Sequence, residues 1–286
     1  MRLSMSKLFM TSLLSSVILN ASSIDSKIEN FFKSAVNGRG GLYEVKSIKV
    51  RSHKDLKQIP GWKVYFVDID LNMLKGPNQG DMLVHEKVFT NGKYIAKDFL
   101  GLDNHSSLKR EVAVDITDTS IYNKKHLIYG TGNEPHKIVA ISDPLCPFCQ
   151  EFMPGFLKAV KEHPGKIAVY YYHLPLARLH LAAPTLSRLM LVAKKKGVKD
   201  VELKTYQNKD YFVTDEKDED KTIRAFNQVM GTSITKDEIH QPDIEAEIKE
   251  DKKYVDALMV SGTPTIYLDG KKDATRQKYK SILGIK

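Results

Sequence analysis

The stretch IVAISDPLCPFCQEFMPGF, residues 138–156, decides the fold of this chain. Its apolar start, Ile138–Ile141, predicts a buried strand, and the residues that follow predict a helix interrupted by Pro154. The chain's two cysteines, Cys146 and Cys149, therefore stand where the strand passes into the helix. Unpaired amides and the helix dipole favour a thiolate at that place, so we expect the pKa of Cys146 to fall below its free value of about 8.5.

A C-x-x-C pair can serve several roles, and disulfide exchange is the one favoured here. A disulfide between positions i and i+3 closes a very small loop, so as a structural link it would stabilise little. Zinc is another alternative, but it needs two more ligands, and the nine histidines include no clustered pair at ligand spacing. We therefore expect no metal, with Cys146 as the attacking nucleophile and Cys149, one helical turn further on, as the resolving thiol.

The residues between the cysteines, Pro147 and Phe148, are expected to tune the redox potential of such a centre. Pro147 suits the first helical turn, where its missing N–H costs nothing. Phe148 is expected to be exposed and to contact unfolded substrate. Two histidines further along, His173 and His180, either lie near the dithiol and tune the thiolate or are ordinary structural residues, which is the commoner case.

A second informative segment is VSGTPTI, residues 260–266, about 118 residues after the dithiol. It joins the end of a predicted helix to a predicted strand, and a proline there is by itself an ordinary helix stop. In a thioredoxin-like fold, however, the residue before a cis-proline faces the active-site sulfur, and its backbone pairs with a substrate strand. Thr263 and Pro264 are the residues that would hold these positions.

The second half of the chain has the order strand, helix, strand, helical insertion, strand, helix, which is an α/β pattern. The strand Ile167–His173 is rich in β-forming residues, and the strand Thr265–Leu268 precedes a closing helix over Ala274–Leu283. We predict a thioredoxin-like catalytic domain with a helical insertion over residues 135–286. The helices expected in the insertion are Leu179–Lys196, Val201–Tyr206, Lys221–Met230 and Ile244–Met259.

Residues 24–105 are predicted to form a small α+β domain. Asp25–Val36 predicts a short amphipathic helix, and an Asn91-Gly92 pair predicts a hairpin turn. A polar and partly helical linker, residues 106–134, would join this domain to the catalytic one. Alternating apolar runs predict the strands Leu42–Val50, Trp62–Leu71 and Met82–Phe89.

The first 23 residues predict export. A basic start at Arg2 and Lys7 precedes the apolar run Leu8–Leu19 and the small residues Ala21–Ser23, which is the order of a cleaved secretory signal peptide. The run is short for a bilayer-spanning helix, although an uncleaved anchor is the alternative. We expect the mature chain to be soluble and to lie in an oxidising compartment.

The chain's positive charge does not indicate a nucleic-acid partner. The formal net charge is +9 and the sequence pI is about 9.2, but the lysines are scattered over the whole length with acidic residues between them. No basic segment carries the interleaved aromatic residues of a nucleic-acid groove. We therefore expect no nucleic acid among the partners.

These features together resemble the catalytic domain of the bacterial periplasmic disulfide isomerases DsbC and DsbG. The likeness rests on residues 138–156 and on Thr263 with Pro264, and the CPFC centre is especially close to the DsbG type. Over the N-terminal domain the likeness is fainter and rests on the hairpin Val88–Ile95. The resemblance implies a periplasmic, V-shaped homodimer whose dithiols face a shared uncharged cleft, with the threonine and proline as the substrate-facing loop.

The resemblance also implies an activity, although the chain departs from that family in places. It lacks an additional disulfide, and the final hairpin strand after Gly270 is reduced or absent. The sequence of Tyr170–Ala177 and the residue His180 look more like those of relatives found in lineages where one dimeric Dsb protein acts as an oxidase. The implied activity is isomerisation or reduction of disulfides in misfolded exported proteins, with no cofactor beyond the dithiol and a DsbD-type membrane reductase as partner. The alternatives are an oxidase recharged by a DsbB-type enzyme and a chaperone without redox turnover.

Overall fold

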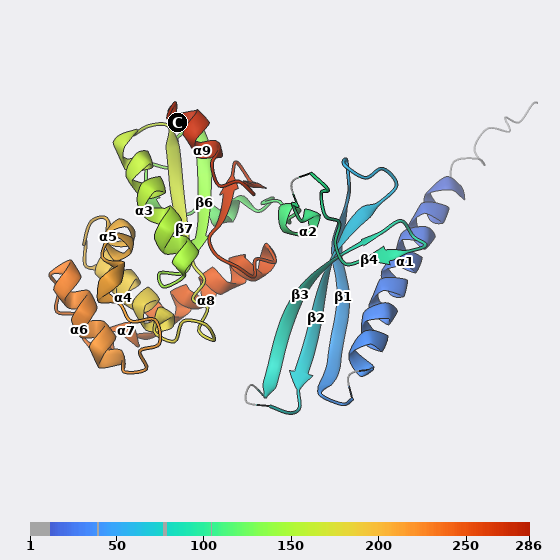
Figure 1. Ribbon diagram of the computed structural model, residues 1–286, viewed down its shortest axis with the longest axis horizontal. Coiled ribbons are helices and arrows are strands. Elements are labelled where there is room, and N and C mark those ends of the chain that lie inside the picture. The colour runs from blue at the N-terminus through green and yellow to red at the C-terminus, as the bar shows by residue number, and fades with distance from the viewer. Residues whose placement is uncertain (1–11, 39, 77–78, 104) are drawn as a thin grey trace, which may run out of the picture. The chain divides into compact units, whose positions relative to one another are not determined.

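The computed structural model describes residues 12–38, 40–76, 79–103 and 105–286. The described part of the chain forms two compact units, which divide between Val112 and Ala113 (Figure 1). The basic start of the predicted signal peptide and the first residues of its apolar run lie outside the described residues. Within the described ranges, no helix is long and apolar enough to cross a membrane.

The N-terminal unit is an antiparallel sheet with strand order β1-β2-β3-β4, and a long helix, α1, packs on it. The predicted strands and the hairpin are confirmed, since Thr90 pairs with Ile95 across the turn, where the Asn91 side chain accepts two backbone amides. The elements of this unit are α1 (Ser12–Asn37), β1 (Tyr43–Asp55), β2 (Lys63–Met73), β3 (Gly80–Thr90), β4 (Ile95–Ala96) and α2 (Leu108–Glu111).

Alternation along β2 gives this sheet two apolar faces. Tyr65 and Val67 lie on the face that buries Ile28 of α1. Phe66 points to the opposite face and is fully buried. On that face the Phe99 ring packs edge-on against the rings of Trp62 and Phe89, at centroid distances of 5.0 and 5.3 Å. The segment after β4 therefore covers the side of the sheet that α1 leaves open.

The C-terminal unit contains a mixed sheet with strand order β5-β7-β6-β8-β9, in which β6 and β7 are parallel and the other pairs antiparallel. Its elements are η1 (Thr119–Ile121), β5 (Leu127–Tyr129), β6 (His136–Ser142), α3 (Pro147–Glu162), β7 (Ile167–His173), α4 (Ala183–Lys195), α5 (Val201–Gln207), η2 (Lys209–Tyr211), α6 (Glu219–Met230), α7 (Lys236–Ile239), α8 (Pro242–Ala257), β8 (Thr265–Leu268), β9 (Lys271–Lys272) and α9 (Lys278–Leu283).

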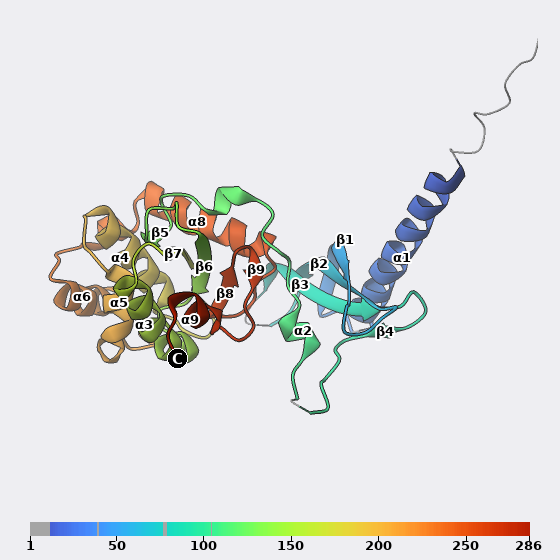
Figure 2. The same cartoon turned by 90° about the horizontal axis from the view of Figure 1, so that it is seen from above.

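The central strands of this sheet are buried on both faces, with helices on either side (Figure 2). Along β7, Val169 and Tyr171 belong to the larger core, which includes residues of α3, α4, α5 and α6. Tyr170 and Tyr172 belong to the smaller core, which includes Val255 of α8. The Tyr-rich run that predicted a strand is thus a strand with no exposed face.

The order of elements predicted for this half of the chain is confirmed, but three helices differ from the prediction. The closing helix expected from Ala274 begins at Lys278. The predicted interruption at Pro154 is wrong, because α3 runs through it. Proline removes one amide hydrogen bond, and the burial of Met153, Phe156 and Leu157 around it holds the helix together. The helix expected from Leu179 instead begins four residues later, which places Pro184 in its first turn, where proline is tolerated.

At the two ends of this sheet the strands are short. β9 has two residues, in line with the expected reduction of the final hairpin. β5 lies inside residues 106–134, the range predicted as a linker, and it pairs with β7. Part of the predicted linker is therefore a strand of the C-terminal sheet.

Candidate active site

The dithiol lies at the junction of β6 and α3. Cys146 has extended backbone and stands just before the first turn of α3, where its carbonyl oxygen accepts the amides of Cys149 and Gln150, both at 2.9 Å. Pro147 occupies the first turn, so its missing N–H leaves no bond unmade. The Phe148 amide of that turn has no helical carbonyl to bond, and it donates to the Cys146 sulfur together with the Cys149 amide.

The two sulfurs differ in their access to solvent. Cys149 is fully buried, whereas Cys146 retains 5% of its surface at the start of the helix. Phe148 between them is 64% exposed, so its exposure is as the sequence predicted. An incoming disulfide can therefore reach the sulfur of Cys146 and not that of Cys149.

Thr263 and Pro264 reach the same place from a distant part of the chain. β8 begins directly after them and pairs antiparallel with β6, so that Thr265 lies opposite Ile141 near the end of that strand. The Thr263–Pro264 peptide bond is cis. The Cys146 sulfur lies 3.5 Å from the carbonyl oxygen of Thr263, to which it donates when protonated. The structure thus brings the proline loop and the outer cysteine together.

Hydrogen bonding separates the two cysteines in acidity. The pKa of Cys146 is lowered to about 5, and the largest cause is a hydrogen bond from the Cys149 thiol. The Thr263 side chain and the first amides of α3 lower it further, while partial burial acts in the opposite direction. Burial, reinforced by the same bond to Cys146, raises the pKa of Cys149 well above its ordinary value. At neutral pH the pair therefore holds a thiolate at Cys146 and a thiol at Cys149, which is the charge state required for attack by the outer sulfur.

A carboxylate that sequence reasoning missed, Asp143, holds the loop before the dithiol. One of its oxygens accepts the Leu145 amide at 2.7 Å, and the other accepts the Leu176 amide and faces Nδ1 of His180, each at 2.8 Å. Asp143 and His180 are both buried. His180 therefore contacts the active-site loop through Asp143 and does not touch either sulfur in the contacts described. The signal in the sequence was an aspartate three places before Cys146, a common start for a side-chain-capped turn.

His173, the other histidine that the sequence placed either near the dithiol or in a structural role, packs in the core of the C-terminal unit. Its ring packs edge-on against Tyr171 at a centroid distance of 4.9 Å, and its Nδ1 has no hydrogen-bond partner within the described ranges. Burial lowers the pKa of His173 to about 3, so its ring is neutral at physiological pH. Its amide donates to Asp251 on α8 at 2.9 Å.

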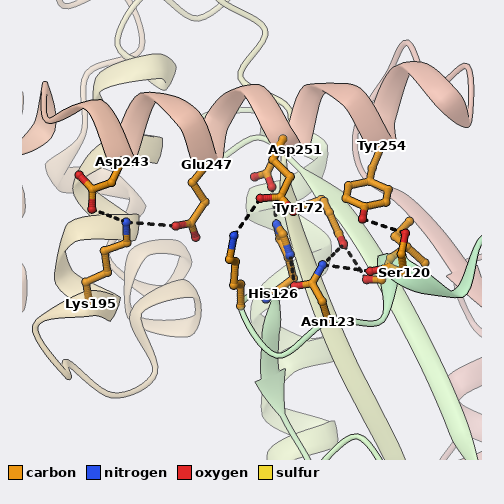
Figure 3. Close-up of polar contacts among 12 residues, drawn as sticks. Ser120, Asn123, His126, Tyr172, Lys195, Asp243, Glu247, Asp251 and Tyr254 are labelled. Carbon is orange, nitrogen blue, oxygen red and sulfur yellow. Dashed lines mark hydrogen bonds and ion pairs between the residues drawn. The ribbon is translucent and has the colours of Figure 1, made fainter.

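That aspartate belongs to a second buried polar cluster, which ties α8 to β7 and to the segment before β5 (Figure 3). Asp251 lies 2.5 Å from Nε2 of His126, whose ring stacks on Tyr172 and whose Nδ1 faces Asn123 at 2.7 Å. Every member has a partner inside the cluster, which accounts for its burial structurally. Among the described residues, no group of three His, Cys, Asp or Glu side chains is arranged to hold a metal ion.

A family model described as thioredoxin matches residues 122–285. No curated protein gives a significant match to the chain. Among solved structures, the chain is similar to a candidate protein-disulfide isomerase from Pseudomonas syringae (15% identity, TM-score 0.48, 57% of this chain and 99% of that one). It is also similar to the catalytic domain of ScsC from Proteus mirabilis (17%, 0.45, 58% and 91%) and to a periplasmic thioredoxin-like protein from Salmonella enterica serovar Typhimurium (18%, 0.46, 59% and 97%). The family match confirms the expected thioredoxin-like fold, whereas the DsbC/DsbG type stays a prediction.

Proposed function

Because this chain belongs to the thioredoxin family, we propose that it is an exported thiol–disulfide oxidoreductase that isomerises or reduces wrong disulfides in misfolded exported proteins. The observation that carries this proposal is the pairing of an acidic Cys146, slightly exposed at the start of α3, with a fully buried, protonated Cys149. A purely structural cysteine pair has no need for such a difference.

The reaction begins when the Cys146 thiolate attacks one sulfur of a substrate disulfide. A bond forms between Cys146 and that sulfur, the substrate disulfide breaks, and the second substrate sulfur leaves as a thiolate that takes a proton from solvent. The mixed disulfide then has two fates. A substrate thiol attacks it and completes an isomerisation, or Cys149 attacks it and releases a reduced substrate.

The surface beside the dithiol is suited to apolar segments of unfolded chains. Phe148 is exposed, and so are Leu179 and Leu181 in the segment that Asp143 ties to the active-site loop. The Ala182 amide bonds the Thr214 carbonyl, which brings the exposed Tyr211 and Val213 alongside that segment. Misfolded proteins expose apolar residues that folded proteins bury, so such a surface favours them as substrates.

The test is reactivation of a scrambled multi-disulfide protein by the mature chain, with Cys146→Ser as the control. Recovery that depends on Cys146 is the expected result. Recovery that persists in the serine variant would indicate that the protein is a chaperone that works without redox turnover. No recovery, with fast oxidation of a reduced substrate, would move it to the oxidase function.

The oxidase function has one observation in its favour. A depressed Cys146 pKa makes that sulfur a good leaving group and stabilises the reduced protein, so the disulfide form becomes a stronger oxidant. The redox state of the dithiol in intact cells distinguishes the two functions. A mostly reduced dithiol indicates an isomerase served by a DsbD-type membrane reductase, and a mostly oxidised one indicates an oxidase served by a DsbB-type enzyme.

We also propose that the chain works as a periplasmic homodimer assembled through its N-terminal domain. The support is the family resemblance together with the position of β1 at the edge of its sheet, where it pairs with β2 alone among the described strands. Deleting residues 24–105 is expected to give a monomer that keeps thiol reactivity and loses isomerase activity. A truncated chain that isomerises as well as the full one would remove the case for a shared cleft.

A further inference from the structure

Three hydroxyl groups from three different elements meet behind the dithiol. The Ser142 hydroxyl at the end of β6 lies 2.7 Å from the hydroxyl of Tyr206 on α5, which in turn lies 2.7 Å from that of Tyr171 on β7. All three residues are buried, with at most 2% of their surface exposed. We call Ser142, Tyr171 and Tyr206 the hydroxyl cluster.

The hydroxyl cluster lies against the resolving cysteine. The Ser142 side chain and the Asp143 amide are hydrogen-bonding neighbours of the Cys149 sulfur, and both act to lower its pKa against the effect of burial. The Thr263 hydroxyl acts in the same direction from the proline loop, and it lowers the pKa of Cys146 as well. Polar donors therefore surround a sulfur that is otherwise embedded in the larger apolar core.

This arrangement bears on the step in which Cys149 closes the cycle. In that step Cys149 loses its proton and attacks the mixed disulfide on Cys146; the Cys146–Cys149 bond forms, and the bond to the substrate sulfur breaks. The substrate leaves as a thiolate that takes up the proton. Negative charge thus develops on a fully buried sulfur, and burial without donors would strongly oppose it.

We propose that the hydroxyl cluster stabilises the Cys149 thiolate as it forms, and so controls the rate of the resolving step. Ser142 donates its proton to the sulfur, Tyr206 donates to the Ser142 oxygen, and Tyr171 donates to Tyr206, so that each hydroxyl strengthens the next. Ser142 is the group that contacts the reacting atom, and the two tyrosines are positioning residues. The inference rests on the proposed thiol–disulfide exchange and names residues for one of its two steps.

Hydroxyls suit this task because the same group can both accept and donate. Once Cys146 is held in the mixed disulfide, the Cys149 thiol can donate to the Ser142 oxygen, and when the thiolate forms the Ser142 proton turns to the sulfur. A carboxylate in that place would repel the thiolate. Besides Cys149, the titratable groups that face the cluster are His173 on β7 and Glu202 on α5. His173 is neutral, and burial raises the pKa of Glu202.

The experiment separates the two steps in the full mature chain. The reduced protein is mixed with oxidised glutathione and quenched in acid, and mass spectrometry follows the mixed disulfide as it forms and decays. In Ser142→Ala we expect formation within about twofold of the unmodified chain and decay about tenfold slower, because one hydrogen bond to a developing charge is lost. In Tyr206→Phe the decay is expected to slow about threefold, and in both variants the decay rate should reach its plateau at higher pH.

Tyr267→Phe is the matched control. Tyr267 is a fully buried tyrosine of the same sheet on the opposite face, and its hydroxyl has no hydrogen-bond partner within the described part of the chain. Its loss is expected to change neither step. If Ser142→Ala folds poorly, the test rests on Tyr206→Phe alone. A decay rate and pH profile of the tested variant equal to those of Tyr267→Phe would overturn the inference. Failure to form any mixed disulfide at Cys146 would instead overturn the proposed function.

Discussion

Replacing Cys149 by alanine should make Cys146 less acidic, because the Cys149 thiol is the first cause of the depressed pKa at Cys146. A hydrogen bond to a charged group contributes about 1.5 to 3 kcal/mol, and one pKa unit corresponds to about 1.4 kcal/mol, which gives a rise of about 1 to 2 units. The Cys146 sulfur is partly open to water, so we expect the lower half of that range.

The assay is the rate of alkylation of Cys146 by iodoacetamide as a function of pH, with thiolate absorbance as a second readout. For the unmodified chain we expect a midpoint at a pKa of about 5. In Cys149→Ala the thiolate fraction at pH 6 should fall from about nine-tenths to between about one-quarter and one-half, while at pH 8 the two proteins should react alike. The pH at which the difference is measured therefore decides whether it is seen.

Phe148→Ala serves as the control for this measurement. Phe148 affects Cys146 through its amide, and its side chain is exposed, so the midpoint should not move. An unchanged midpoint in Cys149→Ala would show that the helix amides and Thr263 suffice to hold the thiolate. A midpoint near 8.5 in the unmodified chain would refute the electrostatic account of the site.

Further predictions concern stability. Asp143→Asn should lower the free energy of unfolding in urea by about 3 kcal/mol, because the buried carboxylate bonds two amides and His180. As the control, Asp269→Asn changes an exposed carboxylate beside a histidine and should lower the free energy of unfolding by less than about 1 kcal/mol. Pro154→Ala should raise the free energy of unfolding by about 1 kcal/mol or more, since the alanine restores an amide hydrogen bond inside the continuous helix α3. The reduced protein should gain stability over the oxidised one as pH rises from about 5 towards the unfolded thiol pKa of about 8.5, and lose that gain as pH falls through the folded pKa of Cys146; urea midpoints of both forms at pH 4 and pH 7 check this.

Features that depend on neighbouring residues could be predicted from the sequence. The period-two pattern of Trp62–Leu71 predicted β2, because a strand with two different faces must alternate. The run Ile138–Ile141 and the proline after Cys146 placed the dithiol at a strand–helix junction for equally local reasons. The Asn-Gly pair after Thr90 predicted the hairpin, because a tight turn needs residues that tolerate its backbone angles.

Features that depend on tertiary pairing could not be predicted. Tyr171 was correctly assigned to a strand, but nothing near it in the sequence indicates that its hydroxyl meets that of Tyr206, 35 residues away. Ser142 likewise reads as the polar end of an apolar strand, and its role depends on a helix 64 residues further on. The interruption predicted at Pro154 was wrong because the rule that proline ends a helix takes no account of the burial of the neighbouring residues.

The depth of each sulfur in the fold decides which cysteine meets the substrate and which one closes the cycle. Cys146 lies before the first turn of α3, where amides and the Cys149 thiol stabilise its charge and a partner can approach. Cys149 lies three residues into the helix, so its charge must be stabilised by neighbouring polar groups of the fold. These are the hydroxyl cluster, the Asp143 amide and the Thr263 hydroxyl. An exchange of the two roles would require a thiolate to stand at rest in the apolar core, which burial opposes. The order of attack follows from the positions of the cysteines on one helix, and the speed of the second attack follows from the hydroxyls around the deeper one.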